Sequence, residues 1–331
     1  MLISIVILPE AFSVEHFSKP QYQDNMQILL EGIQTNGLIL VDKEERLYNE
    51  IYDKVLSLAE NGKYQKIVVH FEELVKKQRA RKIRFVKTNI TSKPPGLQLS
   101  EVAERIAIDC KGCSLLTDPN TTYHSTVVQT TGGKVPVIPI LNYIPSNIEA
   151  ERKKYLNGLP SLDMMEIGQF DKLIIDATRF SRSLKFYDKQ IGKGTNLSGF
   201  RRGIEKILQL WVKNAYFPKN ELSVILFTVV DESFYRCTDA AEAYNKIKAN
   251  LVDALAKKFG LRFEFIMKHD PESHCHARHL QTQTFAIMFE KGFDFLENDG
   301  KLSRTFITIG GDFSDHLNEF QKLKPYIPPR P

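Results

Sequence analysis

The sequence predicts an α/β protein made of two α/β domains with mainly parallel sheets. Short aliphatic and β-branched runs alternate along the chain with longer stretches in which apolar residues recur at helical spacing. The 331 residues exceed the size of about 250–300 residues at which a single hydrophobic core usually stops growing. The composition is 42% hydrophobic and 26% charged, which excludes a disordered, collagen-like or disulfide-scaffold protein.

The first half is expected to contain three buried strands and at least three helices. Aliphatic and β-branched residues predict the strands, at residues 3–8, 37–41 and 113–117. Apolar positions three and four residues apart predict helices at 25–35, 44–60 and 100–112, the first two closed by Asn-Gly pairs. Residues 66–87 fit either one long helix or a strand followed by a helix.

A second alternation of strands and helices is expected after a joining segment. Residues 131–170 are rich in Gly and Pro and show little periodicity, so we expect a linker or joining excursion between domains at 1–130 and 171–331. Strands are then expected at 172–177, 222–230, 262–267, 282–289 and 305–309. Helices are expected at 199–216 and 240–259.

The cysteine content and the apolar runs indicate where the protein resides. Four scattered cysteines are too few for a disulfide framework and suit a reducing compartment. The apolar start of the chain has no basic leader, and no later stretch reaches ~18 consecutive apolar residues. We therefore expect a cytoplasmic protein without a transmembrane segment.

Acidic residues follow each of the three strands expected in the first half. They are Glu10, Asp42 and Asp118, and Glu101 begins the helix that leads into the last strand. Ligands of open α/β sheets gather at the carboxyl ends of the strands, where these side chains are expected to meet. Clustered carboxylates repel one another unless a cation neutralises them, and Mg²⁺ and Mn²⁺ prefer oxygen ligands. The sequence therefore predicts a metal site at Glu10, Asp42, Glu101 and Asp118; the alternative is that these acids are solvated turn or cap residues.

Residues 101–109 (EVAERIAID) and 114–118 (SLLTD) resemble the C-terminal half of PIN-like nuclease domains. In those domains an acid begins a helix and a second acid follows a strand that ends in Thr. The resemblance covers about residues 1–125 and implies catalysis by Glu10, Glu101 and Asp118 at the first, third and fourth acidic positions. Asp42 and Glu31 are the candidates for the second position. Such domains hydrolyse phosphodiesters with bound divalent ions, which clamp the attacking and leaving oxygens.

Basic residues are concentrated in one segment of the first half. Seven lie between positions 76 and 87 without one acid, leaving 38 basic and 40 acidic residues elsewhere, although the whole chain carries +5. Contacts of Lys and Arg with phosphates release counterions, so this run predicts salt-dependent binding of nucleic acid. The alternative is a solvated helix face, which seven cations would destabilise by repulsion. The residues are Lys76, Lys77, Arg79, Arg81, Lys82, Arg84 and Lys87.

Histidines are concentrated in the second half. Five potential zinc ligands lie within eleven residues: His269, His274, Cys275, His276 and His279. Ligands so close on one strand or loop rarely complete a tetrahedral zinc site, so zinc is the less favoured interpretation. On a strand, His274, His276 and Arg278 would share one face.

The same segment carries a second resemblance. His276-Ala-Arg278, followed by residues 285–287 and by a Gly-Phe-Asp turn at 292–294, resembles the end of the phospholipase-D-like fold in the C-terminal domain of MIT-domain proteins. The resemblance covers about residues 170–298. The His-x-Lys-x4-Asp motif of phospholipase D enzymes is absent, because Arg278 replaces the Lys and Gln283 stands at the position of the Asp. The resemblance implies either covalent catalysis at His276 or an anion site formed by Arg179, Arg182, His276 and Arg278. A polar surface loop is the alternative.

Together these patterns predict a metal-dependent nuclease that acts on DNA or RNA. The first domain would cleave, and the second would bind nucleic acid or an anionic ligand. A role in prokaryotic antiviral defence or in a toxin system, with a second copy or a partner protein, follows from association with the two families and not from the residues. Two alternatives stay open: a non-catalytic protein that binds nucleic acid or an anionic ligand, and a metal-independent phosphodiesterase that uses His276.

Overall fold

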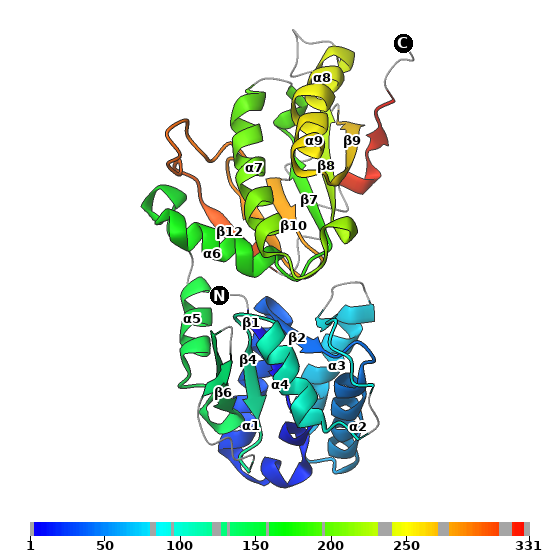
Figure 1. Cartoon of the computed structure of the whole chain (residues 1–331), viewed down its shortest axis with the longest axis vertical. Coiled ribbons are helices and arrows are strands. Elements are labelled where there is room, and N and C mark those ends of the chain that lie inside the picture. The colour runs from blue at the N-terminus through cyan, green and yellow to red at the C-terminus, as the bar shows by residue number, and fades with distance from the viewer. Residues whose placement is uncertain are drawn as a thin grey trace. The chain divides into compact units, whose positions relative to one another are not determined.

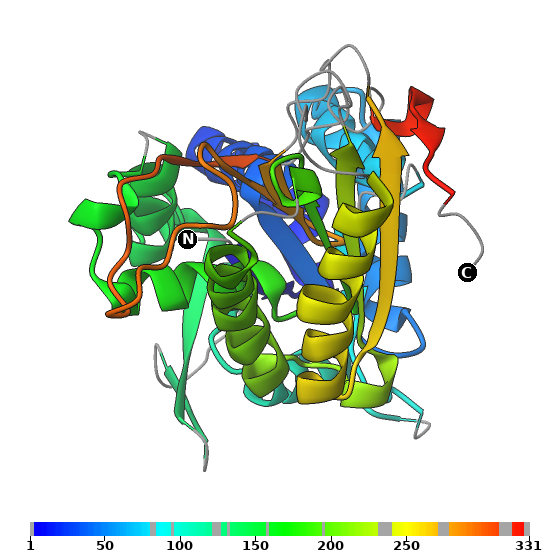
Figure 2. The same ribbon diagram turned by 90° about the horizontal axis from the view of Figure 1, so that it is seen from above.

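The computed structural model divides the chain into two compact units, Met1–Asn157 and Gly158–Pro331. Each unit is α/β and has its own sheet, as Figures 1 and 2 show. The structure describes residues 3–79, 84–93, 96–120, 127–130, 133–156, 159–193, 196–230, 240–270, 278–310 and 320–327. No helix in these ranges is both long enough and apolar enough to cross a membrane.

The first unit contains a six-stranded sheet in the order β3-β2-β1-β4-β6-β5. Five strands are parallel: β1 (Ile3–Ile7), β2 (Gly37–Val41), β3 (Phe85–Lys87), β4 (Ser114–Thr117) and β6 (Gly133–Pro139). At the edge, β5 (Val127–Thr130) pairs antiparallel with β6. In the centre, Ile5 of β1 lies opposite Ile39 of β2 and Ser114 of β4. Strand β1 is therefore buried on both sides, as its continuous aliphatic run predicts.

The described part of the first unit has five α-helices, of which the first four lie between strands and the fifth follows the last strand. They are α1 (Pro20–Asn36), α2 (Arg46–Glu60), α3 (Gln65–Arg79), α4 (Leu99–Asp109) and α5 (Asn147–Leu156). Helix α2 illustrates how the sequence specifies them, because Leu47, Ile51, Val55 and Leu58 lie on one face and are all buried. Three short 3₁₀ helices, η1 (Pro9–Phe12), η2 (Val14–Ser18) and η3 (Ile140–Asn142), follow β1 and β6. The ambiguous segment 66–87 forms α3 and then β3, the reverse of the order considered.

The division between the two units falls inside the segment 131–170, where a linker or joining excursion is expected, but much of this segment belongs to the first unit. Residues 133–139 form β6, in which Val137 lies opposite Leu115 of the central strand β4. Helix α5 follows within the same unit, and the division between the units falls at Asn157 and Gly158. The segment is rich in Gly and Pro because it contains turns and a strand near the sheet edge, where Pro is tolerated.

The second unit contains a mixed seven-stranded sheet in the order β12-β11-β10-β7-β8-β9-β13. Strands β7 (Ser183–Asp188), β8 (Ser223–Val230) and β9 (Arg262–His269) are parallel. The other four pair antiparallel with their neighbours: β10 (Arg278–Gln281), β11 (Ala286–Phe289), β12 (Ile307–Gly310) and β13 (Lys324–Pro325). The expectation of mainly parallel sheets therefore holds for the first unit and not for the second.

Helices cover one face of this second sheet, as both ribbon views show. They are α7 (Leu197–Asn214), α8 (Ala240–Ile247) and α9 (Ala254–Phe259), the last two joined by a π-helical turn, η7 (Lys248–Asp253). Shorter elements are η4 (Leu162–Met164), η5 (Ile191–Lys193) and η6 (Lys219–Glu221).

The strand expected at residues 172–177 is instead part of helix α6 (Ile167–Thr178). Phe170, Leu173, Ile174 and Ala177 are buried along one face of this helix. Their spacing of three, four and seven residues is helical, and it overrides the short aliphatic run that resembles a strand. The strand in this region is β7, in which Leu184 and Phe186 are buried between more exposed neighbours.

Candidate functional site

The candidate site lies at the carboxyl edge of the first sheet, between β1 and β4. From β1 the chain adds β2 and β3 on one side, then returns to add β4 and β6 on the other. The gap between β1 and β4 is therefore the topological switch point, where ligands of such sheets bind. The N–H of Leu8 donates to the carbonyl of Leu116 at 3.0 Å, so the two strands stay together up to this edge.

Asp118 follows β4 at the switch point and is only 4% exposed. The N–H of Asn120 donates to its Oδ2 at 2.9 Å. The Nε2 atom of His16 lies 3.8 Å from the same oxygen, and His16 is 6% exposed. A carboxylate and an imidazole thus lie side by side in a buried position at the carboxyl edge of the sheet.

Tyr22, on α1, packs behind these two groups. Its ring centroid lies 5.5 Å from that of His16, and its hydroxyl donates to the carbonyl of Ala11 at 2.7 Å. Burial raises the pKa of Tyr22 far above its usual value, and the negative charge of Asp118 raises it further. Tyr22 therefore stays a neutral phenol that supports the site.

Glu10 and Glu101 lie at the same edge of the sheet. Glu10 is exposed in η1, directly after β1. Glu101 is exposed in the first turn of α4, which begins at this edge because the helix runs back to supply β4. In the described part of the chain, no three His, Cys, Asp or Glu side chains are grouped closely enough to hold a metal ion. The acids share an edge but do not converge into one cluster.

Asp42 has a structural role, in contrast to the metal-ligand role expected for it. Its Oδ2 accepts the N–H of Arg46 at 3.0 Å, and its Oδ1 accepts the N–H of Leu47 at 2.8 Å. The hydroxyl of Ser92 also donates to Oδ2 at 2.7 Å. Asp42, three residues before the N-cap residue Glu45, thus caps the first two N–H groups of helix α2, and both of its oxygens accept hydrogen bonds from the protein. The cap interpretation is correct for this acid.

Glu31 is also unsuited to be the second acid. It lies in the later part of α1, toward the opposite edge of the sheet. Its Oε1 accepts from the side-chain amide of Gln27 at 2.9 Å and lies 3.3 Å from Nε2 of His70.

The four described cations of the basic segment do not form one exposed row, because Lys76 and Lys87 are exposed but Arg84 is buried and Lys77 is half-buried. Arg84 is 1% exposed, and both it and Lys77 donate to the carbonyl of Gln34, at 3.2 and 3.1 Å. Lys76 pairs with Glu73 at 2.7 Å, and Lys87 pairs with Glu45 at 2.9 Å. Burial and acids from other segments thus relieve the expected repulsion. The side chain of Arg79, and all of Arg81 and Lys82, lie outside the described residues.

Of the four residues expected to bind an anion in the second unit, the three that the structure describes do not lie together. Arg179 and Arg182 precede β7, at its amino end. Arg278 lies opposite Asp188, at the carboxyl end of the same strand. Arg182 also pairs with Glu221 at 2.8 Å, and its guanidinium lies 3.6 Å from the ring centroid of Phe217. The error arose from the strand wrongly expected at 172–177, which would have put the first two arginines at a carboxyl end.

The histidine cluster is only partly described. His274, Cys275 and His276 lie outside the described residues, so catalysis at His276 stays a prediction. His269 ends β9, and the ring of His279 in β10 stacks on Tyr187 with centroids 4.5 Å apart.

The Gly-Phe-Asp turn at residues 292–294 packs against the buried side chain of Asp188 at the end of β7. The buried carboxylate of Asp188 accepts the N–H of Gln190 at 2.8 Å and that of Phe293 at 3.0 Å. Burial raises the pKa of Asp188 to about 6, although these two hydrogen bonds act in the opposite direction. Gly292 has φ +79°, and a Cβ atom there would lie 2.0 Å from Asp188 Oδ2. Asp294, the last residue of the turn, accepts a hydrogen bond from Asn196 at the start of α7. The turn is therefore structural.

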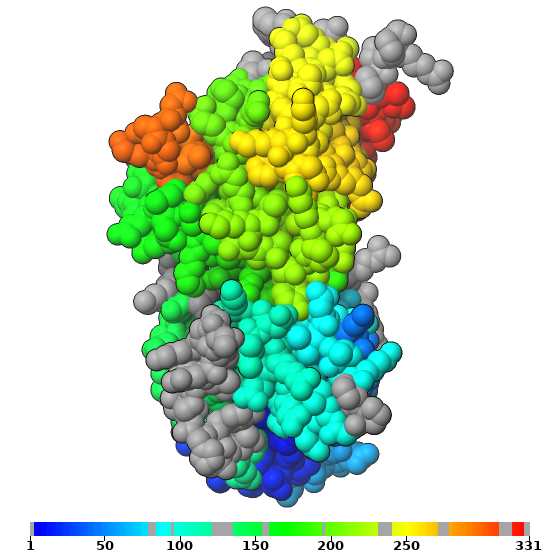
Figure 3. Space-filling model, in the orientation of Figure 1, coloured from blue at the N-terminus to red at the C-terminus, as the bar shows by residue number. Residues whose placement is uncertain are grey.

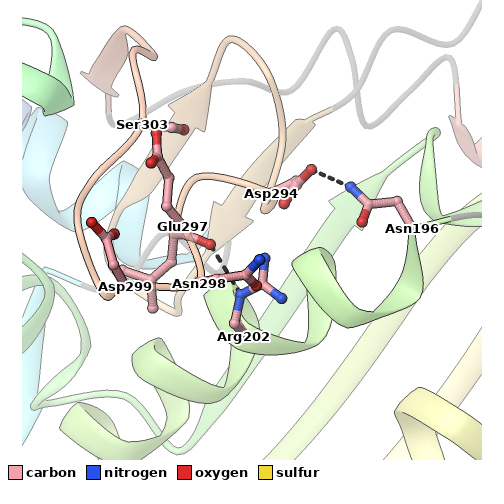
Figure 4. A pocket seen from close by; sticks show the side chains of 8 residues that line it. Asn196, Arg202, Asp294, Glu297, Asn298, Asp299 and Ser303 are labelled. Carbon is pink, nitrogen blue, oxygen red and sulfur yellow. Dashed lines mark hydrogen bonds between the residues drawn. The ribbon is translucent and has the colours of Figure 1, made fainter.

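A pocket of about 450 Å³ lies beside this turn, under the loop that joins β11 to β12 (Figure 4; the loop is the orange lobe of Figure 3). Three of its lining residues are acids, and Arg202 is the only cation among them; its Nε donates to the carbonyl of Leu296 at 3.2 Å. This charge disfavours a phosphate. The lining residues are Asn196, Arg202, Asp294, Leu296, Glu297, Asn298, Asp299 and Ser303.

The sequence indicated the carboxyl-edge acids but not His16. This residue follows β1 in a stretch without strand or helical period, so no pattern distinguished it from a surface histidine. Comparison with protein families, with curated proteins and with solved structures finds no match to this chain.

Proposed function

We propose that the first unit hydrolyses phosphodiester bonds of DNA or RNA at the carboxyl edge between β1 and β4, with Mg²⁺ or Mn²⁺. The observation that carries this proposal is Asp118, a buried carboxylate at the switch point of a parallel sheet. Its resemblance in sequence to the last acid of PIN-like nuclease domains adds support.

The donor set of this edge fits a divalent ion. In phosphoryl-transfer sites such ions are commonly held by one or two carboxylates, with waters and substrate phosphate oxygens as the other ligands. Asp118 would be the fixed ligand, because its carboxylate is buried. Glu10 and Glu101 are exposed on neighbouring elements, so they would approach the ion or orient water as substrate binds. When bound, the ion would lower the pKa of a water and offset charge on the phosphoryl oxygens.

The remaining acids divide into two groups by their contacts. Asp42 caps α2, and Glu31 lies toward the other edge, so neither belongs to the proposed site. The described cations of the basic segment each contact an acid or a backbone carbonyl. We therefore assign substrate binding to the carboxyl edge of the sheet between β1 and β4. Substrate affinity should therefore depend less steeply on salt than seven phosphate contacts would require.

Replacement of Asp118 by asparagine tests the proposal. The variant keeps the shape of the side chain and removes its charge. We expect cleavage of labelled single-stranded RNA, single-stranded DNA and duplex DNA in Mn²⁺ or Mg²⁺ to fall at least about a hundredfold. Asp24→Asn, at an exposed acid of α1, is the matched control and should cleave as the wild type does.

Two results would contradict the proposal. One is undiminished cleavage by a folded Asp118→Asn variant. The other is salt-dependent retention of nucleic acid on filters by the wild-type protein with no cleavage in either ion, which would instead support the binding-only alternative.

A further inference from the structure

We propose that His16 is a further ligand of the divalent ion at this edge, and that it makes the site select a first-row transition ion, such as Mn²⁺, over Mg²⁺. This inference rests on the proposed function, because it assumes an ion at Asp118. It adds a nitrogen donor to a set that the sequence predicts to contain oxygen alone.

The spacing of the two groups is the first argument. His16 Nε2 lies 3.8 Å from Asp118 Oδ2. Hydrogen bonds between such atoms are about 2.7–3.2 Å long, so these two atoms are in electrostatic contact without a hydrogen bond between them. An ion with donors at about 2.1 Å can bridge two atoms up to about 4.2 Å apart. The separation is therefore within the span of two donors on one ion.

The fixed position of His16 is the second argument. The side chain is 6% exposed, and its ring lies against Tyr22. The backbone of η2 is held by the N–H of His16, which donates to the carbonyl of Ser13 at 3.1 Å. A ligand whose position is set before the ion arrives loses little conformational entropy on binding. Both donors are thus preorganised on adjacent elements.

Glu15 is a second acid close to His16, and it is exposed to solvent. Its Oε1 lies 3.7 Å from His16 Nε2, and its side chain is 72% exposed. The His16 imidazole therefore contacts a buried carboxylate, Asp118, and an exposed one, Glu15. Water and a phosphate oxygen could reach an ion bound here from the exposed side.

The chemistry of the donors leads to the selectivity. Mg²⁺ is a hard ion that is held almost entirely by oxygen, whereas imidazole nitrogen is a common ligand of first-row transition ions. Mn²⁺ binds nitrogen donors most weakly in that series, so it is a stringent probe. A site with His16 and Asp118 as its fixed donors should thus bind Mn²⁺ more tightly than Mg²⁺.

Pulsed electron paramagnetic resonance of the whole wild-type protein with one equivalent of Mn²⁺, without nucleic acid, tests this directly. We expect ¹⁴N modulation from a coordinated imidazole. His16→Gln should abolish the modulation and weaken Mn²⁺ binding by about tenfold or more, and leave Mg²⁺ affinity, measured by competition, unchanged. His70→Gln, at a half-buried histidine beside Glu31, is the matched control and should leave the spectrum as in wild type.

The possible results separate this inference from the proposed function. Absence of nitrogen modulation in the wild type overturns the inference, and that spectrum decides even if His16→Gln fails to fold. Modulation that persists in His16→Gln, or an equal loss of Mn²⁺ and Mg²⁺ affinity, also overturns it. If cleavage depends on Asp118 but no nitrogen is coordinated, the inference alone fails. If nitrogen from His16 is coordinated but no nucleic acid is cleaved, the ion site stands and the proposed function fails.

Discussion

Replacing Asp42 with alanine should destabilise the first unit without removing a metal ligand. The substitution deletes three acceptor contacts: those to the N–H groups of Arg46 and Leu47, and that to the hydroxyl of Ser92. Each such hydrogen bond contributes about 1 kcal/mol net, and a negative charge at a helix N-terminus adds about 0.3–1 kcal/mol. We therefore expect the free energy of unfolding to fall by about 3 kcal/mol. Asp42→Asn, which keeps one carbonyl acceptor, should cost about half as much.

Urea denaturation followed by far-ultraviolet circular dichroism measures this change. Asp53→Ala, at an exposed acid of the same helix, is the control and should stay within about 0.5 kcal/mol of wild type. Cleavage and Mn²⁺ binding by Asp42→Asn should match the wild type below its unfolding transition. An Asp42→Asn variant of unchanged stability that no longer binds Mn²⁺ would contradict the capping role and indicate that Asp42 is a metal ligand.

Three further predictions concern stability. Glu149 is fully buried and binds Arg152 through hydrogen bonds of 2.6 and 2.7 Å. Glu149→Gln should therefore lower the free energy of unfolding, measured by urea titration, by about 3–5 kcal/mol. Lys153 is an exposed partner 3.8 Å from Glu149, so Lys153→Met should lower it by less than about 1 kcal/mol. Gly292→Ala adds a Cβ atom 2.0 Å from Asp188 Oδ2 and should cost at least about 2 kcal/mol more than Gly300→Ala, which has φ +84° but open space; equal melting temperatures would contradict this. The pKa of Asp188 is raised to about 6 from 3.8, so the folded chain binds this proton more tightly than the unfolded chain. Its contribution to stability should be complete below about pH 4 and lost as the pH rises through 6, a change of about 3 kcal/mol relative to Asp188→Asn measured across that range.

Local pattern was sufficient for much of the fold. The strands that became β1, β2, β4 and β8 are rich in aliphatic residues, and the helix that became α2 has a clear apolar face. In these elements the apolar positions that the sequence pattern identifies are the ones that are buried. The error at α6 arose because the short aliphatic run Leu173-Ile174-Ile175 fits a strand and a helix equally well until neighbouring positions, such as Phe170, are included.

The candidate site was predictable in position but not in composition. Acids that follow parallel strands must lie at one edge of a sheet, and Glu10 and Asp118 do so. The role of Asp42 depends on Ser92, fifty residues away in sequence. The burial of Arg84 depends in the same way on the carbonyl of Gln34. No local pattern contains such contacts, and the approach of His16 to Asp118 is of the same kind.

Single-turnover cleavage tests whether phosphodiester hydrolysis depends on Asp118. Wild-type protein, in excess over end-labelled RNA or DNA, is compared with Asp118→Asn in Mn²⁺ and again in EDTA. We expect cleavage by the wild type that EDTA stops, and a loss of at least about a hundredfold in the variant. Cleavage by the variant at the wild-type rate, or cleavage that survives EDTA, would contradict it.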